Sequence, residues 1–599
     1  MAATTAVTLV VLFLAFVANL VHASPPGPMV TCSSGNTTCI VSNALGSFSD
    51  RSTCDVASVA YPTTETELFN VVSDASLRKQ YMKVVTVYSH SIPKLSCPGG
   101  QSGSGLAIST LYYDKVLEVD LEANQMTVQS GIKLGDFIQA AAAVGLALPY
   151  TPYWLGITIG GLLGTGSHGS SHFGKGSAVH EYVVRMRLVV PSQSGARIID
   201  LGENDDDLLA AKVSLGVLGV ISQVTLQLQP MFKRTITNRV ISDVDFESAV
   251  ASFAAKTEFG DVTWYPSQEK VMFRDDDRVP LSTLGAGIND FTGFREQPSF
   301  LITTTRIAEE LAEFAEDSLA KCLLAKVYVT TLLETGLGYE NNNGRFLDFT
   351  GYPIIGNQSD LQAAGSCLDS NENNLLTVCA WDPRIKGLTY HQTAVSIPVT
   401  SIVDFIGDVR KLNEARPGSL CGTELYSGFL MRFVRNSTAY LGKTEDAVEI
   451  DITYYRSENG TVPRLHEDVL EEIEQMVLFK YNGLPHWGKN RNIGFMGMRE
   501  KLGSKGDKFV DVMNRFDPEG LFSSDWSDAV LGLRSKTPVI DGDGCALEGL
   551  CICSTDNHCA PSRGYLCRPG IVYTEARVCR KTSRVVPEIE EADYERSEL

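Results

Sequence analysis

The amino-acid sequence predicts an α+β protein that is built from several domains. The chain has 599 residues, of which 44% are hydrophobic and 20% charged, and this is enough to form more than one large core. Helix-like and strand-like stretches alternate from about residue 54 to 232, and longer runs of strands and helices follow from about 233 to 480. A cysteine-rich segment at 545–579 follows a Pro/Gly linker. We therefore expect a mixed α/β domain, an α+β cap domain and a small C-terminal module.

The N-terminal 23 residues are predicted to be a secretory signal. The apolar run at 7–21 is short for a membrane span, and the Val21-x-Ala23 sequence that ends this region suits signal-peptidase cleavage. No Lys or Arg precedes the run, so a signal anchor is the alternative. No later segment is long and apolar enough to span a bilayer, so we expect no stable span after cleavage. The expected destination is the secretory pathway, ending outside the cell, in the cell wall or in the vacuole.

The first helix and strand of the mixed domain lead to a single histidine. Apolar side chains recur at helical spacing in residues 64–79, and a β-branched strand follows at about 83–87. The chain then turns into a polar loop that contains His90. On this evidence alone, His90 is a partly buried structural histidine or a functional group.

The rest of the mixed domain continues the same pattern. Residues 115–149 predict two strands joined by a turn, a second turn at Gly131, and a helix from about 134 to 144. A strand of β-branched residues within 216–230 closes the unit. The cap that follows is expected to contain a helix in the segment 306–324 and a strand in the segment 447–455.

Residues 154–183 are unusually rich in glycine, which lets backbone N–H groups approach a bulky anionic ligand closely. Gly164 to Gly169 spell GxGxxG, but they lack the strand-turn-helix context and the later acidic residue of a Rossmann site. Gly169 to Gly176 approach a phosphate loop, yet Gly176 stands where a metal-binding Ser or Thr belongs. A structural loop without a ligand is the remaining alternative. The chain has no GxSxG or HExxH motif, which argues against serine hydrolases and zinc proteases.

Charge and cysteine content restrict the partners and the compartment. A formal net charge of −20, with no Lys/Arg cluster to reverse it locally, argues against a nucleic-acid partner. Six cysteines within 545–579 predict a module held by disulfides, whose pairing the sequence leaves open. A zinc site that includes Cys551, Cys553, His558 and Cys559 is the alternative. N-x-S/T triplets that are compatible with glycosylation occur at Asn36, Asn357, Asn436 and Asn459.

Several motifs in one order resemble the vanillyl-alcohol-oxidase-type flavoproteins, and most of all their aldonolactone oxidase branch with its plant L-gulono-1,4-lactone oxidase-like members. The motifs are the strand-to-"YSHS" corner, "TVQSGIKLGDF", "LPYTPYWLGITIGGLLGTGSHGSS", "GVLGVISQVTLQ" and "HWGK". The resemblance covers most of residues 50–535. It implies a two-subdomain PCMH-type FAD-binding domain with an α+β cap. The predicted organisation is a signal peptide (1–23), an N-terminal arm (24–53), the FAD-binding domain (54–232), the cap (233–480), a segment with the HWGK motif (481–535), the cysteine-rich module (545–579) and an acidic tail (580–599) that we expect to be disordered.

The resemblance implies FAD as the cofactor, attached covalently through His90. In covalently flavinylated members of the family, the loop that matches 87–93 wraps the pyrophosphate, and the histidine that matches His90 bonds the flavin 8α-methyl group. The family's usual glycine triplet is replaced here by Val87-Tyr88-Ser89, and His168 is the alternative point of attachment. The implied cofactor-binding residues are Val87, Tyr88, Ser89, His90, Ser91, Ile92, Gly160, Gly161, Gly164, Thr165, Gly166, Ser167, His168, Gly169 and Ile221.

The resemblance also implies the catalytic residues. The family's Glu-x-Arg pair matches "LMR" here, so Arg432 is retained while Leu430 replaces the glutamate. We expect Glu424 to be a candidate for the missing acceptor, although a structural carboxylate is the alternative. The HWGK motif places His486 and Lys489 at the substrate and flavin edge, where Lys489 would supply positive charge to the reduced ring.

The implied activity is FAD-dependent oxidation of L-gulono-1,4-lactone or a related aldonolactone to the ascorbate precursor, with oxygen reduced to hydrogen peroxide. A cytochrome in place of oxygen is the alternative acceptor. Oxidation of another carbohydrate or alditol is the alternative reaction. An extracellular binding protein without catalytic activity is the alternative from another functional class.

Overall fold

The structure is a computed structural model that describes residues 30–42, 53–86, 93–289, 297–336, 339–340, 349–362, 377–378, 389–425, 428–456, 459–533 and 537–582. The predicted signal, the loop from Val87 to Ile92 that contains His90, and residues 583–599 of the predicted acidic tail lie outside these residues. Arg580 and Lys581, which the sequence predicts as the start of the tail, belong to the strand Arg577–Lys581. The described residues form a mixed assembly of helices and sheets, which confirms the predicted α+β class. No helix in this part of the chain has both the length and the apolar character that a membrane span requires.

Two five-stranded sheets form the N-terminal unit. The strand order of the first sheet is β1 (Val30–Ser34), β2 (Thr37–Val41), β3 (Cys54–Ala60), β5 (Leu106–Ser109) and β4 (Met82–Val85). The order of the second is β10 (Gly195–Gly202), β9 (Val183–Ser192), β11 (Val220–Gln227), β7 (Gln125–Gln129) and β6 (Val116–Asp120). The pairs β3–β5 and β4–β5 are parallel, and the second sheet is antiparallel throughout. This arrangement ends β4 immediately before the loop that contains His90.

Helices pack against these sheets and close the cores between them. Helix α2 (Glu65–Leu77) begins where the Thr64 side chain accepts a hydrogen bond from the Glu67 backbone N–H, and it packs against β9 and β10. Helix α3 (Leu134–Ala143) buries the apolar face that the sequence predicts, in the core that it shares with the second sheet. The short helix α4 (Ile159–Gly164) carries part of the glycine-rich segment.

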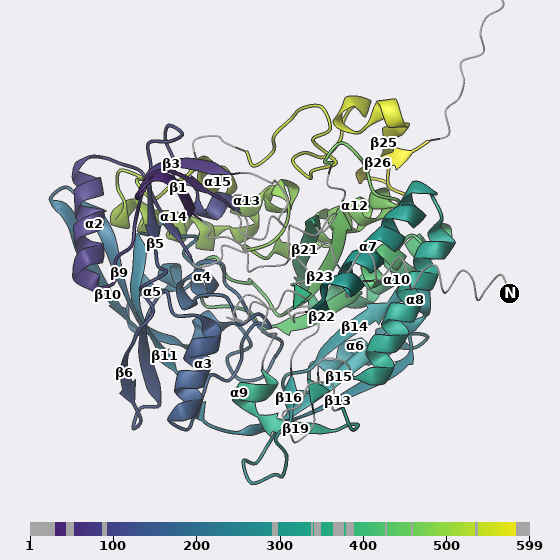
Figure 1. Cartoon of the computed structure of the whole chain (residues 1–599), viewed down its shortest axis with the longest axis horizontal. Coiled ribbons are helices and arrows are strands. Elements are labelled where there is room, and N and C mark those ends of the chain that lie inside the picture. Colours follow the sequence, from purple (N-terminus) through teal and green to yellow (C-terminus); the bar gives the residue numbers. More distant parts are fainter. Residues whose placement is uncertain are drawn as a thin grey trace, which may run out of the picture.

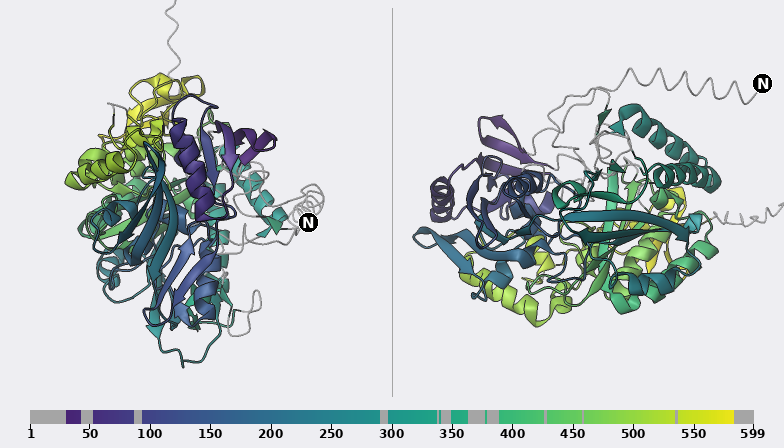
Figure 2. Two further views of the ribbon diagram at one scale, coloured as in Figure 1. Left: turned by 90° about the vertical axis from the view of Figure 1, so that its left-hand side faces the viewer. Right: turned by 90° about the horizontal axis from the view of Figure 1, so that it is seen from below.

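The cap is built on one eight-stranded antiparallel sheet. Its order is β19 (Ile354–Asn357), β13 (Lys233–Ser242), β15 (Lys270–Val279), β14 (Asp261–Tyr265), β22 (Phe429–Val434), β23 (Ala447–Arg456), β21 (Thr389–Pro398) and β24 (Leu484–Pro485). Helices α6 (Phe246–Phe253), α10 (Ile402–Ala415) and α12 (Glu467–Gln475) cover one face through a common apolar core. The N-terminal unit and the cap lie side by side, as Figure 1 and the right view of Figure 2 show.

The chain returns to the N-terminal unit after the cap. Helices α13 (Met498–Leu502), α14 (Ser504–Phe516) and α15 (Asp525–Val530) contribute to the same core as α3 and the second sheet. Trp487 of the HWGK motif is buried in this core as well, and its indole N–H donates to Leu441 O at 2.7 Å. The HWGK segment therefore joins the two units, because the neighbouring β24 is the edge strand of the cap sheet.

The segment 306–324, which the sequence predicts as one helix, forms two. Helix α7 (Ser299–Phe314) ends before Glu316, whose φ of 56° is left-handed. Helix α8 (Ser318–Thr335) begins where the Asp317 carboxylate accepts a hydrogen bond from Ala320 N at 3.0 Å. A left-handed residue and an N-cap therefore interrupt a polar stretch whose periodicity alone gives no sign of a break.

The C-terminal module is held by disulfides, as the sequence predicts. Its pairs are Cys545–Cys551, Cys553–Cys567 and Cys559–Cys579. In this state the sulfurs are not available as thiolates, the form that binds zinc. Three further disulfides are Cys32–Cys39, Cys54–Cys97 and Cys322–Cys421. The module includes the hairpin of β25 (Tyr565–Pro569) and β26 (Arg577–Lys581) and lies next to α12 at the top of Figure 1.

Candidate active site

A large cavity lies where the glycine-rich segment meets the two N-terminal sheets. It encloses about 720 Å³, part of which is open to solvent. Its walls come from segments far apart in the sequence, at the ends of β4, β5 and β7, in α4, and around the start of β11. The lining residues are Val84, Thr86, Leu95, Ser96, Thr110, Ser130, Thr158, Gly160, Gly161, Gly164, Thr165, Ser214, Leu215, Gly216, Gly219 and Ile221. A lining that combines polar and apolar groups from several segments suits an organic cofactor.

The glycines of this segment serve two different purposes. A Cβ at Gly164 would meet nothing within 4 Å, so this glycine leaves free space at the cavity wall. A Cβ at Gly169 would lie 2.6 Å from Thr151 O, so this glycine lets two backbone segments pack closely. Gly160 is an intermediate case, because a Cβ there would lie 3.0 Å from atoms of Ser130. The open glycine at the cavity wall fits a bound group with a large planar ring and a pyrophosphate, because such a group needs close backbone approach.

The predicted cofactor-binding residues divide into four groups. Five of them line the large cavity: Gly160, Gly161, Gly164, Thr165 and Ile221. Gly166 and His168 line a second cavity of about 440 Å³, which shares Thr165 with the first. The Ser167 hydroxyl lies 3.2 Å from the Thr165 hydroxyl, and Gly169 packs against Thr151. The remaining six, from Val87 to Ile92, lie outside the described residues.

One buried lysine, which contacts residues that line the large cavity, was not predicted from the sequence. Lys83 lies on β4 with 1% of its surface exposed, and its Nζ donates to Gly216 O at 3.1 Å. Burial lowers the pKa of Lys83 to about 7, although Asp517 and Asp528 favour its charged form. Lys83 therefore fixes the turn at 215–216 against the cavity. Its place within an apolar strand pattern conceals this role in the sequence.

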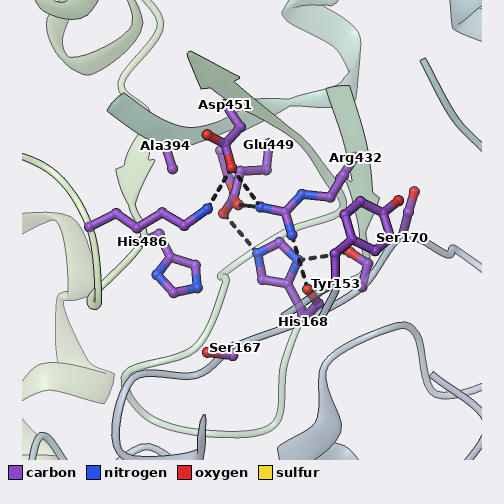
Figure 3. Close-up of polar contacts among 12 residues, drawn as sticks. Tyr153, Ser167, His168, Ser170, Ala394, Arg432, Glu449, Asp451 and His486 are labelled. Atoms are coloured by element: carbon purple, nitrogen blue, oxygen red, sulfur yellow. Dashed lines mark hydrogen bonds and ion pairs between the residues drawn. The ribbon is translucent and has the colours of Figure 1, made fainter. Parts of the chain in front are cut away.

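A buried cluster of charged side chains connects the glycine-rich segment to the cap sheet (Figure 3). Arg432 of β22 donates from Nη2 to Glu449 Oε1 at 2.6 Å and to Asp451 Oδ2 at 3.0 Å, and from Nη1 to His168 O at 3.1 Å. His168 Nε2 lies 2.7 Å from Glu449 Oε2. Lys489 Nζ donates to Asp451 Oδ2 at 2.5 Å. Arg432, Lys489 and His168 therefore meet on two carboxylates of β23.

Glu449 is the centre of this cluster. It is fully buried, and burial disfavours its charge, but His168, Arg432 and Lys443 together hold its pKa well below the usual range. Lys443 Nζ lies 3.4 Å from Glu449 Oε2, and burial lowers the pKa of Lys443. Two carboxylates thus face three cationic side chains, so the cluster is net positive when Lys443 is protonated.

His486 lies beside this cluster with its ring centroid 5.5 Å from that of His168. Burial holds the pKa of His486 well below its ordinary value, and the charge of Lys489 lowers it further, so the imidazole is neutral near pH 7. The Gly488 backbone N–H donates to His486 Nδ1 at 3.0 Å. The single proton of the neutral ring is therefore on Nε2, and this nitrogen is a hydrogen-bond donor.

Asn490 fixes the loop that carries His486 and Lys489. Its amide makes a two-way contact with Ala394 of β21, accepting from Ala394 N and donating to Ala394 O, both at 2.9 Å. The same Nδ2 also donates to His486 O at 3.0 Å. Asn490 has a left-handed φ of 77°, which asparagine tolerates better than most residues. The loop is thereby attached to the edge of the cap sheet.

The two carboxylates were not predicted as site residues. In the antiparallel register, Glu449 lies directly across from Arg432, and Asp451 directly across from Leu430, the position at which this sequence lacks the family's glutamate. The signal in the sequence is a pair of acidic residues spaced i, i+2 in the strand "AVEIDITYY". The residues directly before, between and after them are apolar. A pair with this spacing lies on one face of a strand, so a buried charged face could have been inferred.

Glu424 lies away from the cluster, in α11 (Cys421–Glu424). Its carboxylate accepts hydrogen bonds from Ser267 N at 2.5 Å and from Gln268 Nε2 at 3.2 Å. These two residues follow the last residue of β14, whereas Asp261, which pairs with Arg432, is the first residue of that strand. The structure therefore does not bring Glu424, the predicted candidate acceptor, into the cluster. In this position its carboxylate binds the turn that follows β14.

We expect Glu424→Gln to change stability rather than catalysis. Burial raises the pKa of Glu424 from 4.5 to about 7. As pH rises through this window, the unfolded chain releases its proton while the folded chain keeps it, so the native state loses stability. Glutamine cannot ionise, so the variant does not undergo this loss. Between pH 4 and pH 8, the difference in free energy of unfolding should therefore shift in favour of the variant by up to about 3 kcal/mol. Denaturant unfolding at the two pH values measures this, and a fall of more than about tenfold in kcat would restore Glu424 as a catalytic candidate.

Comparison with known proteins gives matches over nearly the whole chain. Family models match for an FAD binding domain at residues 56–195, D-arabinono-1,4-lactone oxidase at 387–530, and the C-terminal domain of L-gulonolactone oxidase 2-like proteins at 542–581. L-gulonolactone oxidase 5 of Arabidopsis thaliana is 52% identical over 568 residues, which cover 94% of this chain and 95% of that protein. L-gulonolactone oxidase 2 of the same plant is 50% identical and covers 97% and 98%.

A solved structure supports the fold independently. A solvent-stable cholesterol oxidase superposes with a TM-score of 0.61 at 16% identity, and the match covers 85% of this chain and all of that chain. At this level of identity the likeness concerns the fold alone. It agrees with the two-sheet N-terminal unit and the sheet-based cap described above.

Proposed function

Because the chain belongs to the L-gulonolactone oxidase family of FAD-dependent oxidoreductases, we propose that it oxidises L-gulono-1,4-lactone or a related aldonolactone to the ascorbate precursor. Molecular oxygen is the proposed electron acceptor, and hydrogen peroxide the second product. The observation that carries the proposal is the cluster of Arg432, Lys489, His486 and two carboxylates. His486 lines the second cavity, which shares Thr165 with the large glycine-lined one. The relatives do not favour a binding protein without catalytic activity.

The residues that would hold FAD are those of the large cavity together with the loop that contains His90. When bound, FAD accepts the hydride that leaves the carbinol carbon of the substrate. The net positive charge of the cluster would stabilise negative charge that develops on a reduced ring nearby. This is the role proposed for Arg432 and Lys489.

The substrate hydroxyl needs a proton acceptor, and we assign this role to Asp451. The supporting observation is that Asp451 lies directly across from Leu430, where the family's glutamate is missing. Asp451 Oδ2 accepts hydrogen bonds from both Arg432 and Lys489. His486 has its proton on Nε2, so it would donate a hydrogen bond to a substrate oxygen rather than act as the base.

A substrate panel tests the reaction. The purified, yellow protein is mixed with L-gulono-1,4-lactone, other aldonolactones and alditols, and peroxide release is followed with and without oxygen. We expect peroxide with an aldonolactone. Turnover of alditols alone would identify the alternative carbohydrate oxidase. Turnover that requires added cytochrome c would show that a cytochrome, and not oxygen, accepts the electrons.

We propose that FAD is covalently attached through His90, which lies outside the described residues. A neutral imidazole is a competent nucleophile for such a bond. His90→Ala is expected to abolish the fluorescent flavin band of the wild type on a denaturing gel, whereas His168→Ala should stay fluorescent. A band that persists in His90→Ala and disappears in His168→Ala would show that the flavin is attached to His168 instead.

We also propose that the protein is exported through the secretory pathway and glycosylated. The supporting observations are the signal-like sequence at 1–23 and the disulfides, which form in oxidising compartments. Asn36, Asn436 and Asn459 are exposed, and Asn357 is half-buried. Glycosidase treatment of the protein from its native tissue, followed by mass spectrometry, tests occupancy at each of the four.

A further inference from the structure

The C-terminal module contacts the chain immediately after the HWGK motif. Ile493 N donates to Gly549 O of the module at 3.1 Å, and Asn492 Nδ2 donates to Pro538 O of the preceding linker at 2.8 Å. Arg491 Nη1 lies 3.4 Å from Leu547 O. These contacts begin two residues beyond Lys489. The module therefore lies against the segment that places His486 and Lys489.

Arg491 is enclosed between the module and the cap. It is 1% exposed, and its Nε donates to Glu474 Oε2 of α12 at 3.0 Å. Gly549 has a left-handed φ of 63°, and a Cβ at this position would lie 2.3 Å from Arg491 Cδ and 2.4 Å from Arg491 Nε. The module thus approaches Arg491 so closely that only glycine fits at position 549. Any larger residue there must displace the Arg491 side chain.

The part of the module that makes this contact is a short closed loop. The disulfide Cys545–Cys551 encloses it, and hydrogen bonds from Gly549 N to Ala546 O and from Leu550 N to Cys545 O, both 2.9 Å long, brace it internally. Closing a loop by a covalent bond reduces the number of conformations that it can adopt. Leu547 O and Gly549 O are therefore held at fixed positions opposite 491–493.

The module is also anchored on α12, the helix that supplies Glu474. The Glu472 carboxylate accepts the backbone N–H groups of Ile571, Val572 and Tyr573 at 2.6 to 2.8 Å. Glu471 accepts from Cys579 N at 2.8 Å. Because a buried carboxylate with several N–H donors resists displacement, the module and α12 form one rigid support.

We propose that the C-terminal module is a positioning element of the active site, which holds the HWGK loop through Arg491 and thereby sets the place of Lys489. This inference rests on the proposed function only in assigning Lys489 its role beside the cofactor. Arg491 acts through the loop and does not itself contact substrate or cofactor. The module is thus a working part of the oxidase rather than an appended binding domain.

The test compares two glycine variants of the full-length holoenzyme. Gly549→Ala places a methyl group against Arg491, whereas Gly544→Ala, at a similar φ of 73° directly before the module, has its nearest neighbour 4.0 Å away. Both carry a similar backbone penalty, so the control isolates the contact with Arg491. Hydrogen–deuterium exchange of the peptide that spans 484–494 is measured beside kcat and KM for L-gulono-1,4-lactone.

We expect exchange in this peptide to rise at least fivefold and kcat to fall at least tenfold in Gly549→Ala, with KM and flavin content unchanged, while Gly544→Ala stays near the wild type. Equal exchange in the two variants would overturn the proposal. If Gly549→Ala does not fold, the pair Cys545→Ser/Cys551→Ser, which retains the other two disulfides of the module, decides by the same readouts. A wild type without lactone oxidation would refute the proposed function, but the exchange result would still decide whether the module supports the loop.

Discussion

Replacing Asp451 with asparagine (Asp451→Asn) is expected to lower kcat for lactone oxidation about 10²- to 10⁴-fold, the range that a positioned proton acceptor contributes. The carboxylate lies 5% exposed between Arg432 and Lys489 and is the group across from Leu430. Asparagine keeps the shape but removes the charge and one acceptor, so the substrate hydroxyl loses its base. KM should change much less than kcat, because the change acts on the chemical step.

Anaerobic stopped-flow measurement of flavin reduction gives the rate of this step directly. The matched control is Asp408→Asn in α10, where another buried aspartate binds Lys411 Nζ at 3.0 Å and the Tyr481 hydroxyl at 2.7 Å, on the helix-covered side of the cap. Both variants lose a buried carboxylate with a lysine partner. If the two reduce flavin at the wild-type rate, Asp451 is not the base, and the acceptor must be sought among the other side chains of the cluster.

The substitution Gly164→Leu is expected to give a folded, colourless protein with no measurable oxidase activity. A Cβ at this position meets nothing within 4 Å, and Gly164 lines the large cavity. A larger side chain is therefore expected to cost the apoprotein little while it occupies volume that FAD would require. Leucine is also a good helix former, which suits the last residue of α4. The ratio of flavin absorbance to protein absorbance after purification measures the effect.

The control for this variant is Gly407→Leu in α10, where a Cβ also meets nothing within 4 Å. Circular dichroism and thermal unfolding should show both variants folded, and only Gly164→Leu should be without flavin. A yellow Gly164→Leu protein with normal turnover would show that the cofactor does not occupy this cavity.

The sequence allows the fold class and part of the site to be predicted, for identifiable reasons. The glycine-rich segment stands out by composition, and four of its residues, together with Ile221 from the later strand, do line the large cavity. Arg432, His486 and Lys489 lie in motifs that resemble those of a known family, and the structure brings them to one cluster. In these cases the chemistry and the local pattern coincide in a short stretch.

The residues that sequence reasoning misses depend on pairing between distant segments. Glu449 and Asp451 become site residues only because the register of β22 and β23 sets them across from Arg432 and Leu430. Glu424 is a candidate only through its proximity to Leu430 in the sequence, but its carboxylate binds Ser267 N, which is distant in the sequence. Neither the register nor such a contact can be read from periodicity, since both depend on pairing between strands or across long stretches of chain.

The docking of Glu472 on three backbone N–H groups near the end of the chain has a consequence for biosynthesis. Residues 571–573 lie 99 to 101 positions after Glu472, so a nascent chain contains α12 well before it contains the N–H groups that bind this carboxylate. We therefore expect α12 to gain its full support only once the module has been synthesised.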